Sequence, residues 1–229
     1  MRTETISSFV DFVEQNDVFG LYSDSVVFRG QGVRGNLLPN IARRDPSIDT
    51  TEIEKKLLEQ LELQGASMLV SNGDKELDLL VTAQHYGLKT RLLDWTTNPL
   101  IALWFACTDP TEGDVYVYGL ETDSLLSHDV YGKSPFSATK TRIIQPRLNN
   151  SRIIAQQGWF TLHRYADKDS RFVPLEKNSE TKEHLHELLI PACVRNSLLK
   201  ALNQHGISSK TIFPDLAGLC RHLNWQHDV

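Results

Sequence analysis

Residues 76–107 constrain the fold most, because three strong local signals follow closely on one another there. A helical pattern covers 76–85 and stops at Gly87, a residue type that commonly ends helices in the left-handed conformation. Thr90–Asp94 is a strand candidate. Asn98 followed by Pro99 is typical of a helix start, and the apolar sequence LIALWFAC that comes next predicts a buried helix. A short strand between helices therefore belongs to the core of the fold.

Helix and strand patterns in the rest of the chain do not alternate regularly, which predicts an α+β fold rather than a βαβ array. We expect a mixed or antiparallel β core flanked by N-terminal and C-terminal helices. One domain over 1–229 accounts for this pattern, with the core at about 20–165 and a C-terminal helical part at about 180–229. Further helices are predicted at 5–16, 51–70, 182–191 and 195–206, with a last helix opened by Pro214. Further strands are predicted at 25–28 (ending at Arg29-Gly30), at 114–118 and as two short strands hinged at Gly158 within 153–163. The segment 122–150 is expected to be rich in loops.

The balance of charges excludes one class of partner. The formal net charge is -5, which argues against broad, non-specific nucleic-acid binding because neutralising phosphates requires a basic surface. A local basic groove remains open, since arginines gather in two stretches of the sequence, the first with Arg29, Arg34, Arg43 and Arg44 and the second with Arg142, Arg147 and Arg152.

Cysteine usage and apolar runs indicate the compartment. The chain has three cysteines and no CxxC pair, which argues against a disulfide framework or a zinc knuckle and fits reduced thiols in a cytoplasm. The N-terminal sequence MRTETISSFVDFVEQ lacks an apolar run followed by a cleavage site, and no apolar stretch approaches the roughly 18 residues of a membrane span. We therefore expect no signal peptide, no membrane segment and a cytoplasmic location.

A first polar cluster, FRGQG, starts at Phe28. Arg29 at a strand end offers a planar fork of donors that suits a phosphate or a carboxylate. The neighbouring glycines allow a backbone or a ligand to approach closely. A tight turn whose arginine is paired with a structural carboxylate explains the same residues equally well.

A second polar cluster, QHYGLKTRLLDWTTNP, covers 84–99 and brings an imidazole, a phenol, a guanidinium and a carboxylate close to a helix start, where free backbone N–H groups attract anions. Arg91 and Asp94 are three residues apart on the predicted strand, so they face opposite sides and do not pair directly. Arg29 is then the expected partner of Asp94. A structural explanation is available for each single residue, with Asn98 as a cap and Trp95 as core, but not for the whole cluster.

A third cluster, RIIAQQGWFT, starts at Arg152. Gln156 either reaches a ligand or satisfies buried backbone groups, and the second explanation is favoured. His184 and His186 are two residues apart in a predicted helix and share no face, which argues against a metal site. The sequence has no Walker loop, GxSxG, HExxH or GxGxxG pattern, so none of these families of site is predicted.

These clusters, in this order, resemble the FRG domain family. Its naming motif is similar to Phe28-Arg29-Gly30-Gln31, and the resemblance runs from about 20 to 225. It implies a domain known mostly from bacterial and phage proteins, some of them encoded beside defence genes. The other matching motifs are His85-Tyr86-Gly87, Thr90 to Thr96, Asn98-Pro99, Ala102 to Ala106, the motif from Arg152 through Gln156 to Thr161, and Ile212 to Leu216.

A fainter resemblance is to the ADP-ribosyltransferase fold. Arg29 is similar to the arginine on the first core strand of those enzymes, and Asp94-Trp95-Thr96 with the helix ending in Phe105-Ala106 is similar to their second element. Gln156 stands where they keep a glutamate. An amide can preserve a hydrogen bond to the ribose but supplies no negative charge to an oxocarbenium-like transition state.

The resemblance implies an NAD-dependent ADP-ribosyltransferase-like effector, of a toxin or phage-defence type, that modifies RNA, DNA or protein and is neutralised by a cognate antitoxin. NAD is the expected substrate, and no metal is implied. The alternative is a non-catalytic nucleotide- or nucleic-acid-binding module. The residues implied are Asp94 and Gln156 for catalysis, and Arg29, Gln31, His85, Tyr86, Arg91 and Thr96 for binding NAD.

Overall fold

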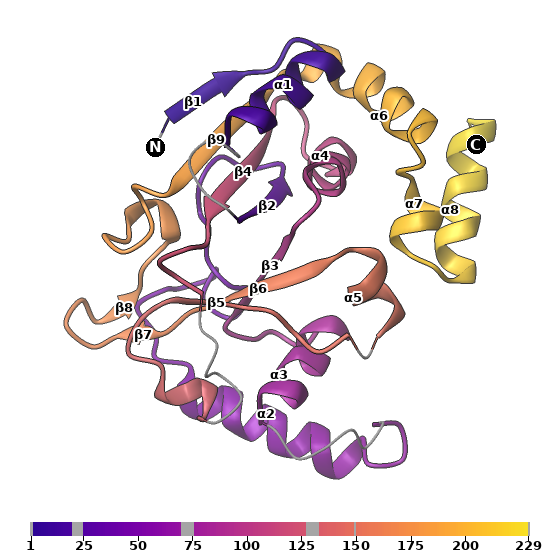
Figure 1. Cartoon of the computed structure of the whole chain (residues 1–229). Coiled ribbons are helices and arrows are strands. Elements are labelled where there is room, and N and C mark those ends of the chain that lie inside the picture. Colours follow the sequence, from indigo (N-terminus) through magenta and orange to yellow (C-terminus); the bar gives the residue numbers. More distant parts are fainter. Residues whose placement is uncertain (1, 20–24, 70–75, 127–132, 149, 229) are drawn as a thin grey trace.

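The computed structural model describes residues 2–19, 25–69, 76–126, 133–148 and 150–228. Its main element is a seven-stranded sheet in which all neighbours are antiparallel except the first pair, which is parallel. The α+β class and the mainly antiparallel core are thus confirmed (Figure 1). The strand order is β1 (Arg2–Thr5), β9 (Leu185–Ile190), β4 (Val115–Glu121), β2 (Val26–Gln31), β3 (Leu92–Thr96), β6 (Gly158–Leu162) and β5 (Arg142–Ile144).

The sheet divides into two halves between β2 and β3. These strands share a single register pair, Phe28 with Thr96, whereas β2 pairs with β4 over its whole length, Val26 to Gln31. Beyond Phe28 the two strands separate, and the backbone groups on the facing edges lose their ladder partners. The first half is β1-β9-β4-β2 and the second is β3-β6-β5.

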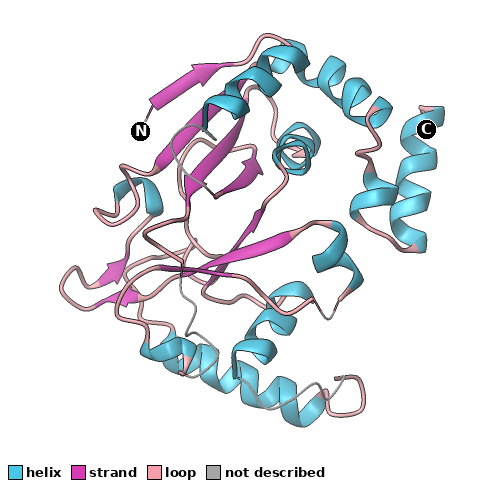
Figure 2. Ribbon diagram, in the orientation of Figure 1, coloured by secondary structure: helices cyan, strands magenta, loops and turns pink. Residues whose placement is uncertain are grey.

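Helices cover both halves (Figure 2). Residues of α1 (Phe9–Phe19), α4 (Pro99–Thr108) and α6 (Arg195–Gln204) share a core cluster with β2, β4 and β9. Residues of α2 (Thr51–Gln64) and α3 (Glu76–His85) share a second cluster with β3, β5 and β6. A third cluster joins strands of both halves. The remaining elements are α5 (Ser151–Ala155), α7 (Ser209–Ile212), α8 (Leu216–His227) and a small sheet of β7 (Tyr165–Ala166) and β8 (Arg171–Phe172).

Glu187 on β9 ties the first half together. Its carboxylate is fully buried, and it accepts hydrogen bonds from Thr3 of β1 (3.0 Å) and from the hydroxyl of Tyr118 on β4 (2.9 Å). Arg34 completes the site with an ion pair of 2.8 Å. A buried carboxylate is tolerated when hydrogen bonds and an opposite charge replace its hydration, so this network fixes three segments distant in sequence.

The two helix boundaries predicted in 76–107 are confirmed, and the strand predicted at Thr90–Asp94 is present two residues later, as β3. Helix α3 ends at His85, and Gly87 has a left-handed φ of 89°. The side chain of Asn98 accepts a hydrogen bond from the backbone N–H of Leu100 at 3.0 Å, and Pro99 opens α4. Gly206, the expected stop of the helix at 195–206, also has a left-handed φ, of 81°.

The helix predicted at 182–191 is wrong: this segment contains β9, which lies between β1 and β4 in the sheet. Its charged residues occur at a spacing compatible with a helix, but pairing on both edges decides the conformation. His184 and His186 consequently do not lie on a helix, and their side chains both contact Glu121, at 3.0 and 2.8 Å.

Other boundaries also differ. The strand expected before Gly158 is instead the short helix α5, which is capped by the side chain of Asn150, and only the second strand is present, as β6. Strand β1 was not predicted, β2 continues past Arg29-Gly30 to Gln31, α2 ends at Gln64, and α1 starts at Phe9. The last helix starts at Leu216 with Asp215 as its cap. Within the described residues, no helix is both long and apolar enough to cross a membrane.

Candidate functional site

Arg29 occupies the gap where β2 and β3 separate. Its Nη1 donates to the backbone carbonyl of Asp94 at 2.7 Å, which replaces the strand pairing lost there. The same nitrogen lies 3.9 Å from Oδ2 of Asp94, which confirms the predicted pair. The Arg29 side chain is only 15% exposed. An arginine therefore spans the break in the sheet with part of its guanidinium still available.

Each residue of the FRGQ motif has its own structural role. Phe28 is core, and Gly30 lies so close to α4 that an added Cβ would come within 1.8 Å of a backbone carbonyl oxygen of that helix. Gln31 accepts a hydrogen bond from Nε of Arg29 at 3.0 Å. Its amide nitrogen also donates to the carbonyls of Val33 and Gly35, at 2.8 and 2.6 Å. Gln31 thus orients Arg29 and fixes the loop that follows, and its amide is already used within the protein.

Asp94 presents an exposed carboxylate beside this arginine. Its side chain is 56% exposed, and both oxygens accept from Nε2 of Gln84, at 3.1 and 3.0 Å. His85 lies nearby at the end of α3. Burial lowers the pKa of His85, the charge of Arg152 lowers it further, and Asp94 acts in the opposite direction. The imidazole is consequently neutral at neutral pH.

Three other predicted residues have structural partners. Arg91 is 1% exposed, and its Nε forms a 2.7 Å ion pair with Glu54, so the structure does not bring it to the gap. The hydroxyl of Thr96 donates to the backbone carbonyl of Gln156 at 2.6 Å. The amide of Gln156 contacts the carbonyl of Ile212 at 3.4 Å, a bond that ties α5 to α7.

Of the implied site residues Arg29, Asp94 and Gln156, the first two are in contact, while the Gln156 side chain is directed to backbone of the C-terminal part. Tyr86 is 77% exposed and its ring contacts that of His85 edge-on. Tyr86 therefore lies at the surface beside His85 and not within an enclosed site.

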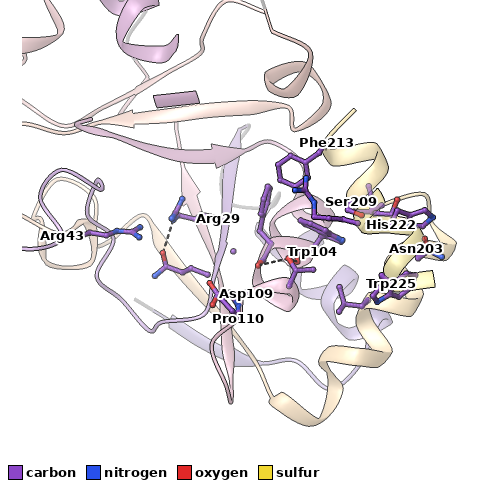
Figure 3. A pocket seen from close by; sticks show the side chains of 18 residues that line it. Arg29, Arg43, Trp104, Asp109, Pro110, Asn203, Ser209, Phe213, His222 and Trp225 are labelled. Atoms are coloured by element: carbon purple, nitrogen blue, oxygen red, sulfur yellow. Dashed lines mark hydrogen bonds between the residues drawn. The ribbon is translucent and has the colours of Figure 1, made fainter. Parts of the chain in front are cut away.

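A cavity of about 670 Å³ opens next to Arg29 (Figure 3). Of the residues predicted as site residues, Arg29 and Gln31 line it, and Asp94, His85 and Thr96 do not. Its far walls come from α4, α6 and α8 and from the segment that contains α7. A volume of this size is typical of small-molecule and cofactor sites.

Positive charge and aromatic rings dominate this cavity. Arg29 and Arg43 lie toward one end, and Arg221 lies at the other over the ring of Phe213, while Trp104, Phe213 and Trp225 add aromatic surface (Figure 3). Burial, opposed by the charge of Asp94 and helped by that of Arg43, lowers the pKa of Arg29 to about 10. Arg29 remains protonated at neutral pH. Two arginines that repel each other across a partly buried space favour the entry of an anion.

The C-terminal part of the cavity was not predicted from the sequence. Phe213, Arg221 and Trp225 come from a segment for which the sequence indicated a helix opened by Pro214 and the motif from Ile212 to Leu216, but no site residue. In the structure Phe213 contacts the rings of Trp104 and Phe105, with centroids 6.0 and 6.2 Å apart. Within the described residues, no group of three or more His, Cys, Asp and Glu side chains is arranged to hold a metal ion.

Comparison with protein families identifies one segment of the chain: residues 24–115 match the family model of the FRG domain. The chain contains an FRG domain. The matched part of the FRG domain includes β2, α2, α3, β3 and α4, and so both Arg29 and Asp94. The C-terminal wall of the cavity lies outside it. Neither the curated proteins nor the solved structures contain a match to the chain.

Proposed function

We propose that this FRG protein binds NAD in the cavity beside Arg29 and transfers its ADP-ribose to a nucleophile of RNA, DNA or protein. The observation that carries the proposal is the position of Arg29. Its guanidinium spans the separation of β2 and β3, contacts Asp94, and faces a cavity of about 670 Å³.

The binding step follows from the charges. Nε and Nη1 of Arg29 are held by Gln31 and Asp94, and among the described residues Nη2 has no hydrogen-bond partner. Those remaining donors match a pyrophosphate, which accepts bidentate hydrogen bonds from guanidinium groups. Arg43, at the rim of the same cavity, supplies a second positive charge. A dinucleotide would thus be clamped at its centre.

The chemical step needs a negative charge near the reacting ribose. The C1′–N1 bond of the nicotinamide ribose breaks, nicotinamide leaves with the electron pair, and the target nucleophile bonds to C1′ and releases a proton. Asp94 is the exposed carboxylate closest to the clamp, and it would stabilise the positive charge that develops on the sugar. The neutral imidazole of His85 can contact the ribose or accept the proton.

A second function has its own support: the domain binds the nucleotide without turnover. Both oxygens of Asp94 accept from the amide of Gln84, and the amide of Gln156 is directed to the backbone of Ile212. A carboxylate whose oxygens are already hydrogen-bonded stabilises a cation less well, and an amide contributes no charge.

Calorimetry and nicotinamide release separate these functions. Arg29→Ala should weaken NAD binding by about 10-fold to 100-fold, the usual loss of hydrogen bonds to a charged group. Arg44→Ala, an exposed neighbour outside the cavity, is the matched control and should bind like the wild type. Asp94→Asn should retain binding and lower nicotinamide release about 100-fold if the transfer occurs.

Each outcome selects one function. Wild-type protein that does not bind NAD overturns both. Binding without nicotinamide release, with protein, RNA and DNA supplied as acceptors, favours the second function. An active transferase of a toxin or phage-defence type should also slow bacterial growth when it is expressed without an antitoxin, and Arg29→Ala should restore growth.

A further inference from the structure

The cavity has a second end whose chemistry differs from that at Arg29. There Trp104 and Phe105 of α4 face the C-terminal segment, which contributes Phe213, and Trp225 comes from α8 (Figure 3). Trp225 is 44% exposed although it is a large aromatic residue, and its ring stacks on that of buried His222 at 6.2 Å with an interplanar angle of 24°. One face of the indole is thus backed by protein, and the ring remains accessible beside an aromatic wall.

Two polar side chains in this end are available to a ligand. The amide of Asn203 on α6 and the hydroxyl of Ser209 on α7 both line the cavity, and neither forms a side-chain hydrogen bond with any described residue. Ser209 is 7% exposed. Both side chains border the open space of the cavity, so both can hydrogen-bond a polar ligand there. The amide of Asn203 adds an NH2 donor group and a carbonyl acceptor in the same plane.

Flat rings and paired donor and acceptor groups fit a nucleobase. Bases stack on aromatic side chains whatever their identity, and their edges need in-plane hydrogen bonds. Arg221, whose guanidinium lies 4.5 Å from the centroid of the Phe213 ring, adds a planar cation to the same wall. An apolar ligand would leave Asn203 and Ser209 unpaired, which favours a base over a lipid chain.

The direction of a bound dinucleotide is fixed by Asp94. The reacting ribose must lie near that carboxylate, which is 3.9 Å from Nη1 of Arg29 and does not line the cavity. The pyrophosphate lies at Arg29 and Arg43. We therefore propose, resting on the function proposed above, that the end lined by Trp104, Asn203, Ser209 and Trp225 binds the adenine of NAD, so that α6, α7 and α8 recognise the half of the substrate that does not react.

Three probes distinguish the two ends: ADP-ribose, AMP and inorganic pyrophosphate, each titrated by calorimetry. Trp225→Ala should weaken ADP-ribose and AMP about 10-fold, the usual effect of removing one stacking ring, and leave pyrophosphate unchanged. Asn203→Ala should weaken the same two ligands about 5-fold. Leu223→Ala and Asn196→Ala, exposed residues of the same two helices that do not line the cavity, are the matched controls.

The outcomes separate this inference from the function on which it rests. ADP-ribose that binds with equal strength to the wild type, Trp225→Ala and Asn203→Ala overturns the adenine site and leaves the proposed function intact. AMP that binds in a manner dependent on Trp225, while NAD is not turned over, supports the adenine site and removes the transferase. Loss of pyrophosphate binding in Trp225→Ala, or no binding of AMP and ADP-ribose to the wild type, overturns the adenine site.

Discussion

Protonation of His163 should control the stability of the protein in mild acid. This side chain is 1% exposed, and its Nε2 lies 3.0 Å from the hydroxyl of Thr161, which also accepts a hydrogen bond of 3.0 Å from the indole of Trp95. Burial, together with the charges of Arg29 and Arg91, lowers the pKa of His163 to about 3. The native state therefore keeps a neutral imidazole well below neutral pH.

The magnitude follows from linkage. An unfolded histidine titrates near pH 6.5. Between about pH 6.5 and about pH 3, His163 is therefore protonated in the unfolded chain but stays neutral in the native protein. Stability contributed by the neutral His163 is complete above that range and is lost as the pH falls. At roughly 1.4 kcal/mol per pH unit, the free energy of unfolding should drop by about 2 kcal/mol between pH 7 and pH 5 from this group alone.

Urea denaturation of the wild type and of His163→Gln at several pH values between 7 and 5 measures the contribution of His163 to the pH dependence of the free energy of unfolding. Gln keeps a polar group near the position of Nε2 but does not titrate, and both proteins share all other titrating groups. The difference between their free energies of unfolding should change by about 2 kcal/mol over the range, with the wild type losing more. Parallel pH profiles for the two proteins would refute the argument, because they would mean that native His163 accepts a proton as readily as the unfolded chain does.

Two further substitutions test packing. Glu54→Ala should cost about 3–5 kcal/mol in urea denaturation because it leaves the buried guanidinium of Arg91 without its partner, whereas the exposed Glu52→Ala should cost well under 1 kcal/mol. Gly30→Ala should lower the free energy of unfolding by at least about 1–3 kcal/mol, since its new Cβ would overlap a backbone oxygen of α4. Gly158→Ala is the control, because its Cβ would meet its nearest atoms at 3.6 Å. Equal losses for the two would contradict the packing described for α4.

Local chemistry could be predicted from the sequence where a residue acts on its own backbone. Gly87 and Asn98 end and start helices through their own φ angle and side chain, and these boundaries were correct. The pairing of Arg29 with Asp94 also followed from a local rule, the alternation of side chains along a strand. The structure adds that this contact bridges a break in the sheet.

Elements that depend on distant partners could not be predicted in this way. Strand β9 has charged residues at helical spacing, and its conformation is decided by β1 and β4, which lie on either side of it. The cavity is similarly non-local, because its lining residues come from β2, the loop at Arg43, α4, α6 and α8. A single conspicuous motif could identify only the end at Arg29.

The place of β9 between β1 and β4 has a consequence for synthesis on the ribosome. Strand β4 ends at Glu121 and β9 begins at Leu185, so about 60 residues must be made before β4 gains its second neighbour; at roughly 5–20 residues per second this takes on the order of 3–12 seconds. Glu187, the anchor of Thr3 and Tyr118, emerges in the same late stretch. The nascent chain thus carries an unpaired hydrophobic strand edge during that interval, which makes it a client for chaperones that cover such edges.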